Sequence, residues 1–524
     1  MQRTPITPEG NLSNRATVKP SGSRGFKSSS ASESGSSDIQ RTPSGPSTIN
    51  VLDHEYPTDD YTNIPSSILS RLSEAPVLLK TPAHPLNLLQ QQIQRHLSSF
   101  TSIWPPPSPV VTSELNFGDL GFDEDHPGRS PTDTYYVNRQ VCLRTHTSAH
   151  EVETFKKGLD AWLLCADVYR RDEIDASHYP IFHQMEGARV FDPTKGDYDE
   201  GGIVLHECEE MEARLREAEI EIDDQVDLQD AGGWQESHNT QHAALALRHL
   251  KATLNGLVLE LFGPRHAVEA AAAAAAAQGT GKKVNIEPLK VRWVSATFPF
   301  TSPSFEIEVL FRGKWLEILG CGVVKQLTLD KAGIPGKLGW AFGLGMERIA
   351  MVLYSIPDIR LFWSKDPRFL SQFALGDTRL LEDKAGPIQT DSVRSAGGND
   401  SFSASSASRS KSAELVTFRP YSKYPPCYKD TSFWLPQDTS PENVRSSRAF
   451  HENDLMEIVR DTAGDLAEAV ELIDDFTHPK TGKRSLCYRV NYRSMDRNLE
   501  NEEVNELHRR AVKRLVDEIG VTLR

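Results

Sequence analysis

The chain has 524 residues, 38% of them hydrophobic and 25% charged, which is enough apolar sequence for roughly two to four domains with cores. No stretch approaches the roughly 18 uninterrupted apolar residues that a membrane-spanning helix needs, so a membrane-spanning protein is excluded. Six scattered cysteines without a Cys-x-x-Cys pair fit reduced thiols better than a zinc ribbon or a disulfide scaffold. The net charge of -15 argues against a protein that coats nucleic acid by bulk charge.

The N-terminal region, 1–75, is predicted to precede the ordered structure, which we expect to start near Pro76. Its first 50 residues are rich in Ser, Pro, Thr and Gly, and the first 32 hold five Lys or Arg and one acidic residue. This composition is typical of a mitochondrial transit peptide. A plain disordered tail is the alternative, because no clean amphipathic helix is visible.

The segment 76–191 predicts two helices followed by two strands. Leu86, Leu89, Ile93 and Leu97 are spaced three or four apart behind Pro85, which indicates an amphipathic helix. A second helix is expected over 148–159. The strands are expected at 161–170 and 181–191, joined by a polar turn at 171–177.

Residues 192–286 interrupt this pattern. They hold 18 acidic and 8 basic residues and the alanine run 270–277, so about two thirds of the excess negative charge lies there. We interpret them as a surface insertion, because long insertions in exposed loops cost little. Strands are expected again at 305–311 and 315–319. A Gly-rich segment followed by a helix is expected over 339–354, and a Ser-rich linker over 374–412.

The last part of the chain, 413–524, predicts a separate domain with the order strand, helix, strand, strand, helix, strand. The expected elements are 428–434, 452–463, 470–476, 485–492, 502–518 and 521–523. This order is that of the split βαβ, ferredoxin-like arrangement.

The densest group of polar residues lies in 168–191, VYRRDEIDASHYPIFHQMEGARVF. Arg170 offers a planar fork suited to phosphate, Asp172 can accept from an amine such as that of adenine, and Phe182 offers a face for a base. A strand interior seldom holds groups such as His183, Gln184 and Glu186, so they are expected to face a ligand. A salt-bridged surface hairpin is the alternative.

Residues 339–354, GWAFGLGMERIAMVLY, combine glycines with a helix start. Gly343 and Gly345 allow close approach of a sheet or a ligand, and Arg348 lies near the helix N-terminus, where an anion is favoured. Ordinary helix–sheet packing explains the glycines equally well.

Residues 142–151, CLRTHTSAHE, have the spacing of a helix cap. Thr147 and Ser148 lie at the expected N-cap, and Glu151 lies three residues after Ser148, as in a capping box. In the alternative, His146 and His150 reach a carboxylate.

Taken together, five motifs resemble the class II aminoacyl-tRNA synthetase core. They are HTSAH, R-x-D…HYPIFHQMEG, FPFTSPSFE, WLEILGCG and GWAFGLGMERIAM…PDIRLFW. The specific resemblance is to the single-chain, mitochondrial type of phenylalanyl-tRNA synthetase, over about 80–190, 290–373 and 415–524. It implies an α+β protein with an antiparallel-sheet catalytic domain at 76–373 and a ferredoxin-fold anticodon-binding domain at 413–524.

The resemblance also implies a role for each matching residue. Arg170 and Arg348 are the catalytic arginines, which hold the ATP phosphates from two sides. The residues implied at the nucleotide are Arg170, Asp172, Ser177, His178, Tyr179, Phe182, Glu317 and Arg348. The residues implied at the amino acid are His146, Thr147, Ser148, Ala149, His150, Glu151, Gln184, Met185, Glu186, Phe298, Phe300, Ala341 and Phe342.

The implied activity is the formation of phenylalanyl-adenylate from L-phenylalanine and ATP, followed by transfer to the terminal adenosine of tRNA(Phe) in the mitochondrial matrix. Magnesium would arrive with ATP, with Glu317 a possible contact, and no tightly bound cofactor is expected. The family's single-chain members are monomers. The basic side chains of the tail are expected to meet tRNA phosphates, namely Lys480, Lys483, Arg484, Arg489, Arg493, Arg497, Arg509, Arg510, Lys513 and Arg514.

Three other functions remain open from the sequence. A synthetase-like RNA-binding protein without catalysis is disfavoured by the intact Arg170, Glu186, Glu317 and Arg348. A class II ligase for another aromatic amino acid is disfavoured by the set Phe298, Phe300 and Ala341. A structural scaffold that uses the acidic segment would leave the five motifs unexplained.

Overall fold

The computed structural model describes residues 47–218, 220–278, 287–382, 416–420, 424–436 and 450–524, and side chains within these ranges except at 276–278 and 375–382. Residues 47–524 form one compact unit. Of the predicted transit-peptide or disordered region, 1–75, residues 1–46 lie outside the described residues. Among the described helices, none is both long and apolar enough to cross a membrane.

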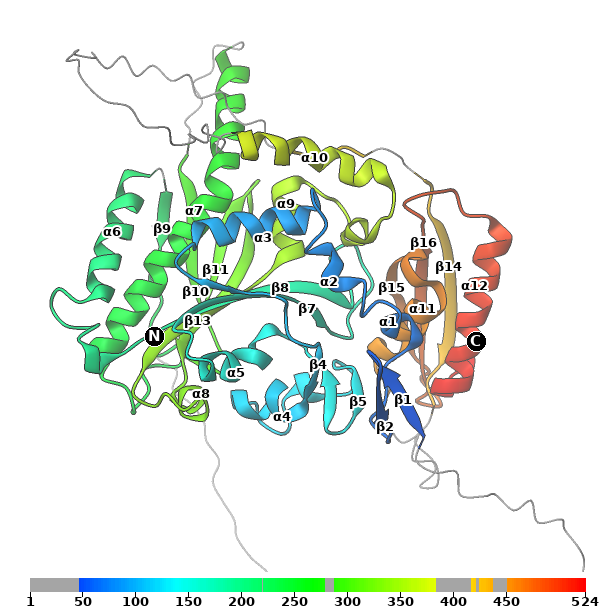
Figure 1. The fold of residues 1–524 in the computed structure, drawn as a ribbon. Coiled ribbons are helices and arrows are strands. Elements are labelled where there is room, and N and C mark those ends of the chain that lie inside the picture. Colours follow the sequence, from blue (N-terminus) through cyan, green and yellow to red (C-terminus); the bar gives the residue numbers. More distant parts are fainter. Residues whose placement is uncertain (1–46, 219, 279–286, 383–415, 421–423, 437–449) are drawn as a thin grey trace, which may run out of the picture. The chain divides into compact units, whose positions relative to one another are not determined.

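A sheet of eight strands is the centre of the larger part of the fold, which precedes residue 383 (Figure 1). Its spatial order is β3 (Thr101–Ile103), β7 (Ala161–Tyr169), β8 (Ile181–Phe191), β13 (Leu338–Gly345), β12 (Lys314–Val324), β11 (Thr301–Phe311), β10 (Leu289–Ala296) and β9 (Ile220–Asp223). The six strands from β7 to β10 pair antiparallel, and only the short edge strands β3 and β9 pair parallel. The predicted strands at 161–170, 181–191, 305–311 and 315–319 are therefore confirmed.

Helices and two small sheets surround this sheet. The helices are α1 (Ser66–Leu69), α2 (Ala75–Leu78), α3 (Pro85–His96), α4 (Ser113–Asn116), α5 (Glu151–Lys156), α6 (Ile203–Glu217), α7 (Thr240–Gln278), α8 (Gln326–Lys331), α9 (Met346–Tyr354) and α10 (Pro367–Glu382). The small sheets are the hairpin β1 (Thr48–Val51) and β2 (His54–Pro57), and the three strands β4 (Val110–Thr112), β6 (Val141–Leu143) and β5 (Tyr136–Asn138). The predicted helix behind Pro85 is confirmed as α3, which begins with that proline and buries Leu86, Leu89 and Ile93.

Ordered structure begins well before Pro76, so this expected boundary is wrong. Residues 47–75 form the hairpin of β1 and β2 and the helix α1. Val51, Ile68 and Leu72 are buried in the main core. Apolar residues in this short segment are sufficient to anchor it, although the surrounding composition is that of a tail.

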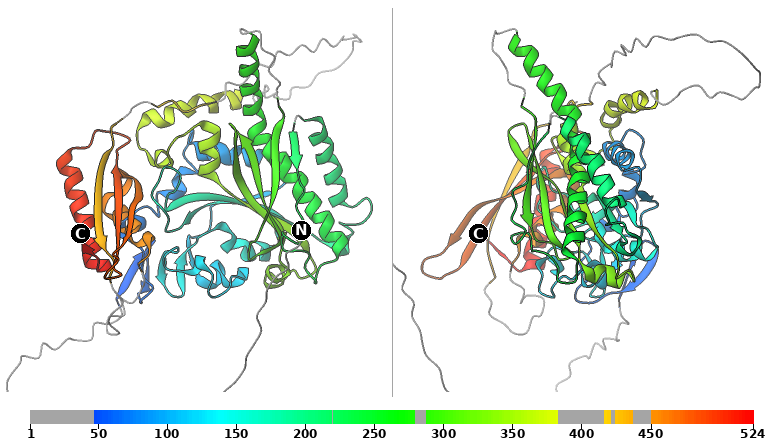
Figure 2. Two further views of the ribbon diagram at one scale, coloured as in Figure 1. Left: turned by 180° about the vertical axis from the view of Figure 1, so that it is seen from behind. Right: turned by 90° about the vertical axis from the view of Figure 1, so that its left-hand side faces the viewer.

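The expected surface insertion at 192–286 is wrong for much of its length. The helix α7 packs along the sheet against β10, β12 and β13, and Figure 2 shows its alanine-rich end extending beyond the sheet. Leu250, Leu254, Leu257 and Phe262 of α7 are buried completely or nearly so. They recur at helical spacing, so one face of α7 closes the core. The more exposed α6 packs beside α7.

The C-terminal domain has the predicted ferredoxin-like order. Its elements are β14 (Cys427–Trp434), α11 (Glu452–Ala463), β15 (Ala467–Thr477), β16 (Arg484–Tyr492), α12 (Asn501–Arg514), a π-helical turn at Leu515–Ile519, and β17 (Thr522–Leu523). The spatial strand order is β15-β16-β14-β17, and all its pairs are antiparallel. The predicted linker at 374–412 is helical as far as Glu382, and 383–412 lie outside the described residues.

Candidate active site

One cavity of about 740 Å³ opens over β8, β12 and β13. Its wall includes most residues that the motifs point to, namely His146, Thr147, Ser148, Arg170, Asp172, Ser177, His178, Tyr179, Phe182, Gln184, Glu186, Phe298, Phe300, Glu317, Ala341, Phe342 and Arg348. These residues come from segments up to 200 positions apart in the chain. Antiparallel pairing of β8 with β13 and of β13 with β12 brings them together.

Arg170 and Phe182 form one side of the cavity. Arg170 directly follows β7, and its Nε donates to the carbonyl oxygen of Thr145 at 2.8 Å, which fixes the guanidinium. The guanidinium carbon lies 5.5 Å from the centre of the Phe182 ring. The hydrogen bond from Nε to Thr145 leaves the other two guanidinium nitrogens to bind an anion. The Phe182 ring beside them is suited to stacking.

Arg348 lines the same cavity from α9. Its side chain is 67% exposed, and its Nη1 lies 3.6 Å from Oε2 of Glu317. The adjacent Glu347 points inward, and its carboxylate binds the ring Nδ1 of His183 at 2.6 Å and accepts from the His183 backbone at 2.8 Å. Glu347 therefore ties α9 to β8, while Arg348 faces the open space.

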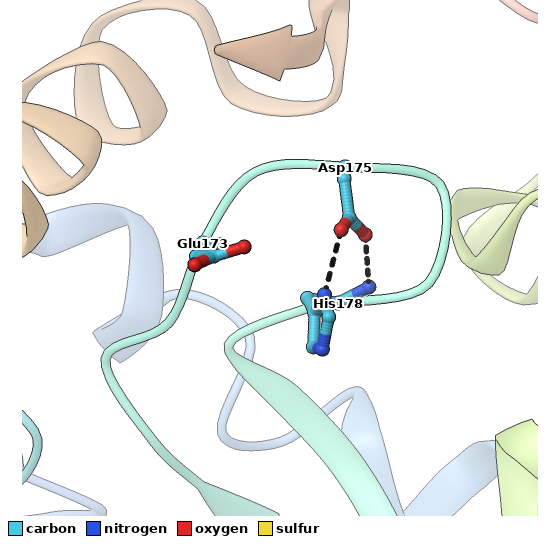
Figure 3. A group of neighbouring side chains, drawn as sticks. All are labelled: Glu173, Asp175 and His178. Carbon is cyan, nitrogen blue, oxygen red and sulfur yellow. Dashed lines mark hydrogen bonds and ion pairs between the residues drawn. The ribbon is translucent and has the colours of Figure 1, made fainter. Parts of the chain in front are cut away.

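The loop between β7 and β8 holds the other residues predicted for the nucleotide. Figure 3 shows one of them, His178, beside Asp175 of the same loop. Asp175 binds the ring of His178 at 2.8 Å and also accepts from its backbone nitrogen, which closes the loop. This hydrogen bond raises the pKa of His178 above its ordinary value. Asp172 and Ser177 are partly or fully exposed beside the cavity. The Tyr179 hydroxyl is instead committed to Asp465, at 2.6 Å.

The pair Ser148 and Glu186 forms the polar end of the cavity. The Ser148 hydroxyl donates to Oε2 of Glu186 at 3.0 Å, and the Thr147 backbone donates to Oε1 of Gln184 at 3.3 Å. Burial raises the pKa of Glu186 to about 7, although these neighbours lower it. The predicted capping box is wrong, because residues 147–150 form a 3-10 turn and Ser148 binds Glu186 rather than a helix end.

Aromatic rings line the wall next to this polar end. The rings of Phe298 and Phe300 lie nearly parallel with centres 6.0 Å apart. His146 lies 6.1 Å from Phe300, and burial together with the charge of Arg170 lowers the pKa of His146 to about 3. The imidazole is therefore neutral and adds to an apolar part of the cavity wall, which also includes Ala341 and Phe342.

Three glycines of the cavity wall, Gly320, Gly343 and Gly345, leave space that a side chain would occupy. A Cβ at Gly343 or Gly345 would meet no protein atom within 4 Å, and both residues line the cavity. Packing against a neighbouring sheet therefore does not account for these two glycines. At Gly320, by contrast, a Cβ would lie 2.6 Å from the Phe298 ring, so this glycine lets the ring sit against β12.

Four of the predicted residues do not line the cavity. Ala149 packs into a separate small core, and Met185 points to the opposite side of β8 from Gln184 and Glu186. His150 is buried with its Nε2 at 3.1 Å from Arg144. Glu151 is fully buried behind the wall. Strand alternation explains Met185, and the 3-10 turn explains the others.

The cavity also contains residues that the sequence did not single out. Phe122 stacks on His146 with ring centres 5.6 Å apart and parallel planes, and His126 meets Phe122 edge-on at 4.7 Å. Asp133 and Thr134 line the same side. An aromatic followed by His-Pro in a turn-rich segment is the one local signal that points to them.

Two family models match the chain. The model for the tRNA synthetase class II core domain (F) matches 73–195 and 266–373, and the ferredoxin-fold anticodon-binding domain matches 422–524. The mitochondrial phenylalanine–tRNA ligase of Saccharomyces cerevisiae is 42% identical over 496 residues, which cover 90% of this chain and 94% of that protein. The chain belongs to the mitochondrial phenylalanine–tRNA ligase family. This confirms the resemblance of the five motifs, the class II core and the ferredoxin-fold tail.

Other members of this family match at similar length. The mitochondrial phenylalanine–tRNA ligase of Rattus norvegicus is 38% identical over 494 residues, 90% of this chain and 89% of that protein. The probable mitochondrial phenylalanine–tRNA ligase of Drosophila melanogaster is 36% identical over 517 residues, 97% and 99% of the two chains.

Proposed function

We propose that this chain is a mitochondrial phenylalanine–tRNA ligase, which joins L-phenylalanine to tRNA(Phe) by way of phenylalanyl-adenylate. The observation that carries the proposal is the single cavity that holds both Arg170 and Arg348 next to an aromatic slot. A guanidinium at each side suits a triphosphate, and a slot lined by Phe298 and Phe300 suits a benzyl group. Family membership supports the same activity.

The chemistry requires positioning rather than a nucleophilic side chain. The carboxylate of phenylalanine is itself the nucleophile, and it attacks the α-phosphorus of ATP with pyrophosphate as the leaving group. Glu186 and Ser148 at the polar end hold the ammonium group, while Gln184 orients the carboxylate. Arg170 neutralises charge at the α-phosphate, and Arg348 does so from the open side.

A carboxylate near Arg348 fits the magnesium that accompanies ATP. Glu317 lines the cavity, and its Oε2 lies 3.6 Å from Nη1 of Arg348. A carboxylate oxygen suits Mg²⁺. We assign Glu317 as the group that would hold it; the ion would supply charge neutralisation of the phosphates.

The C-terminal domain supplies the contact with tRNA in this proposal. Most of its predicted basic residues are paired with acids of the same domain, for example Arg484 with Asp475 at 2.7 Å. Lys480 and Lys483 lie in the exposed turn between β15 and β16. Beside this turn, Arg524 lies 5.5 Å from the Trp434 ring centre. These features favour the hairpin and the open sheet face for RNA phosphates and bases.

The domain boundaries, the oligomeric state and the location in the cell complete the proposal. We propose a catalytic domain that ends at 373 and includes the segment 47–75, a tRNA-binding domain at 413–524, a monomer as the working form, and the mitochondrial matrix as the location. The support is the match of the two family models to these segments, the basic, acid-poor start of the chain, and the mitochondrial relatives. Import of residues 1–75 fused to a fluorescent protein tests the location.

Amino-acid-dependent pyrophosphate exchange with the purified chain tests the activity. We expect exchange with phenylalanine and about 100-fold less with tyrosine, because an apolar pocket rejects an added hydroxyl only to about that degree. Absence of exchange with every amino acid, together with retained tRNA binding, would support the non-catalytic RNA-binding alternative. Stronger exchange with tyrosine would move the chain to another specificity.

A further inference from the structure

The loop between β7 and β8, residues 170–180, carries several residues of the nucleotide site, and we call it the nucleotide loop. A side chain of the C-terminal domain binds its backbone. Arg460 on α11 donates from Nη2 to the carbonyl oxygens of Asp172 and Glu173, to the second at 3.1 Å. The loop is therefore joined to a residue that lies 288 positions beyond Asp172 in the chain.

Further contacts continue from the same loop to the same domain. The backbone nitrogen of Val470 on β15 donates to the carbonyl oxygen of Ile174 at 3.0 Å, so the carbonyl oxygens of three successive loop residues are bound by the C-terminal domain. The Ile174 side chain is buried in the hydrophobic core of that domain. The Tyr179 hydroxyl donates to Asp465 at 2.6 Å. Backbone bonds and an apolar anchor together restrict the loop more than a contact between side-chain ends would.

The loop that is held in this way faces the cavity. Asp172, Ser177 and His178 line the cavity, and the catalytic domain binds the loop through the backbone nitrogen of Ile359, which donates to the carbonyl oxygen of Ala176 at 2.8 Å. A loop that moves freely loses conformational entropy when it binds a ligand. Contacts that fix the loop in advance reduce this cost and therefore strengthen binding.

We propose that Arg460 is a positioning residue for ATP. From the C-terminal domain it holds the nucleotide loop in the conformation that binds ATP, so this domain contributes to the activation of the amino acid as well as to the contact with tRNA. The inference rests on the proposed function, since it needs ATP in the cavity.

The guanidinium group suits this task. Nη1 of Arg460 binds Glu457 at 2.9 Å, which leaves Nη2 for the two carbonyl oxygens of the loop. Donation from a charged group is stronger than donation from a neutral one, and the planar guanidinium presents its donors in fixed directions. Arg460 is buried, so water competes little for these hydrogen bonds. A lysine at this position would offer one ammonium group for the carboxylate and both carbonyl oxygens.

Pyrophosphate exchange by variants on both sides of the contact tests the proposal. Arg460→Met removes the donors and keeps an unbranched side chain, and Ile174→Ala removes the apolar anchor and keeps every charged group. We expect each variant to raise the KM for ATP about tenfold, with kcat and the KM for phenylalanine within about twofold of the wild type. Arg460→Lys, which retains a donor, should raise the KM for ATP only about threefold. An unchanged KM for ATP in Ile174→Ala, or an equal rise in the KM for both substrates, would overturn the proposal.

Leu507→Ala is the matched control. Leu507 on α12 is buried in the same core as Ile174, at 8% exposure against 7%, and a similar apolar volume is removed. This variant weakens the C-terminal domain without removal of an anchor of the loop, so its KM for ATP should equal that of the wild type. A rise as large as that in Ile174→Ala would show that general weakening of the domain is responsible, and it would overturn the proposal.

Hydrogen–deuterium exchange without substrates separates this inference from the proposed function. The backbone amides of 172–178 should exchange about tenfold faster in Ile174→Ala than in the wild type, and Leu507→Ala should leave them unchanged. Equal rates in all three proteins would overturn the inference even if activity with phenylalanine were present. If the wild type showed no amino-acid-dependent pyrophosphate exchange, the proposed function would fail, and these rates would still show whether the C-terminal domain holds the loop.

Discussion

Two adjacent residues of α9 should have opposite effects on stability and activity. Glu347 is buried and accepts two hydrogen bonds from His183, at 2.6 and 2.8 Å, whereas the Arg348 side chain is 67% exposed. Removal of one partner from a buried ion pair costs about 3–5 kcal/mol. An unfolding entropy of about 2.1 cal/mol/K per residue gives a domain of about 330 residues a shift of roughly 1.5 °C per kcal/mol, so Glu347→Ala should lower the melting temperature by about 4–7 °C.

The matched variant Arg348→Ala should behave differently. An exposed ion pair contributes at most about 1 kcal/mol, so the melting temperature should fall by less than about 2 °C. Loss of a group that stabilises the transition state should nevertheless reduce pyrophosphate exchange about 10²-fold or more. Both variants are measured by thermal unfolding and by exchange at a temperature where each is folded.

The loss of stability in Glu347→Ala relative to the wild type should depend on pH, and the pKa of His183 determines the direction of this dependence. Burial lowers the pKa of His183, but Glu347 raises it overall above the ordinary value of about 6.5. The charge interaction is therefore fully present below that pH and is lost as the pH rises through the raised value. Glu347→Ala should be most destabilised relative to the wild type near pH 6. Equal melting temperatures for Glu347→Ala and the wild type at that pH would refute this role for Glu347.

Four further outcomes are expected. Arg170→Ala should reduce exchange at least about 10²-fold, because the Arg170 guanidinium neutralises the α-phosphate; retained exchange would remove this assignment. Ala341→Gly should admit para-substituted phenylalanines, and an unchanged substrate range would place the end of the pocket elsewhere. Gly320→Ala should raise the KM for phenylalanine about tenfold with the KM for ATP unchanged, since the new Cβ would lie 2.6 Å from the Phe298 ring; equal KM values would show that the ring is not at the substrate. The affinity for tRNA should fall steeply with salt, and a salt-independent affinity would argue against phosphate contacts by the tail.

The strands and the tail were predictable because their patterns are local. Alternating apolar residues identify β11, and turn residues around 478–482 identify the hairpin between β15 and β16. The motif residues could be assigned to one site because the five motifs also follow one another along the chain in the order of the family that they resemble. Antiparallel pairing then brings Gln184 and Glu186 on β8 opposite Gly345 and Gly343 on β13.

The helix α7 was misjudged for a physical reason. The acidic and alanine-rich composition of 192–286 concealed a helical apolar repeat, which places Leu250, Leu254, Leu257 and Phe262 against the sheet. Composition averaged over 95 residues carries no information on one face of one helix. The apolar repeat becomes visible in the sequence when the residues of α7 are considered apart from the acidic residues that precede them.

The details of the site could not be predicted from the sequence, because they depend on which side chains are buried, and sequence spacing does not determine this. Ser148 and Glu151 have the spacing of a capping box, but a 3-10 turn directs Ser148 to Glu186 and buries Glu151 behind it. Phe122 enters the cavity from a segment with no periodic pattern. Both cases require the tertiary structure, because charged residues are seldom fully buried and loops carry weak patterns.

A crystal structure with a non-hydrolysable analogue of phenylalanyl-adenylate tests the central claim most directly. We expect the phenyl ring beside Phe298 and Phe300, the ammonium group at Glu186, and the phosphate at Arg170. An analogue bound with its ring away from the aromatic pair, or outside this cavity, would contradict it.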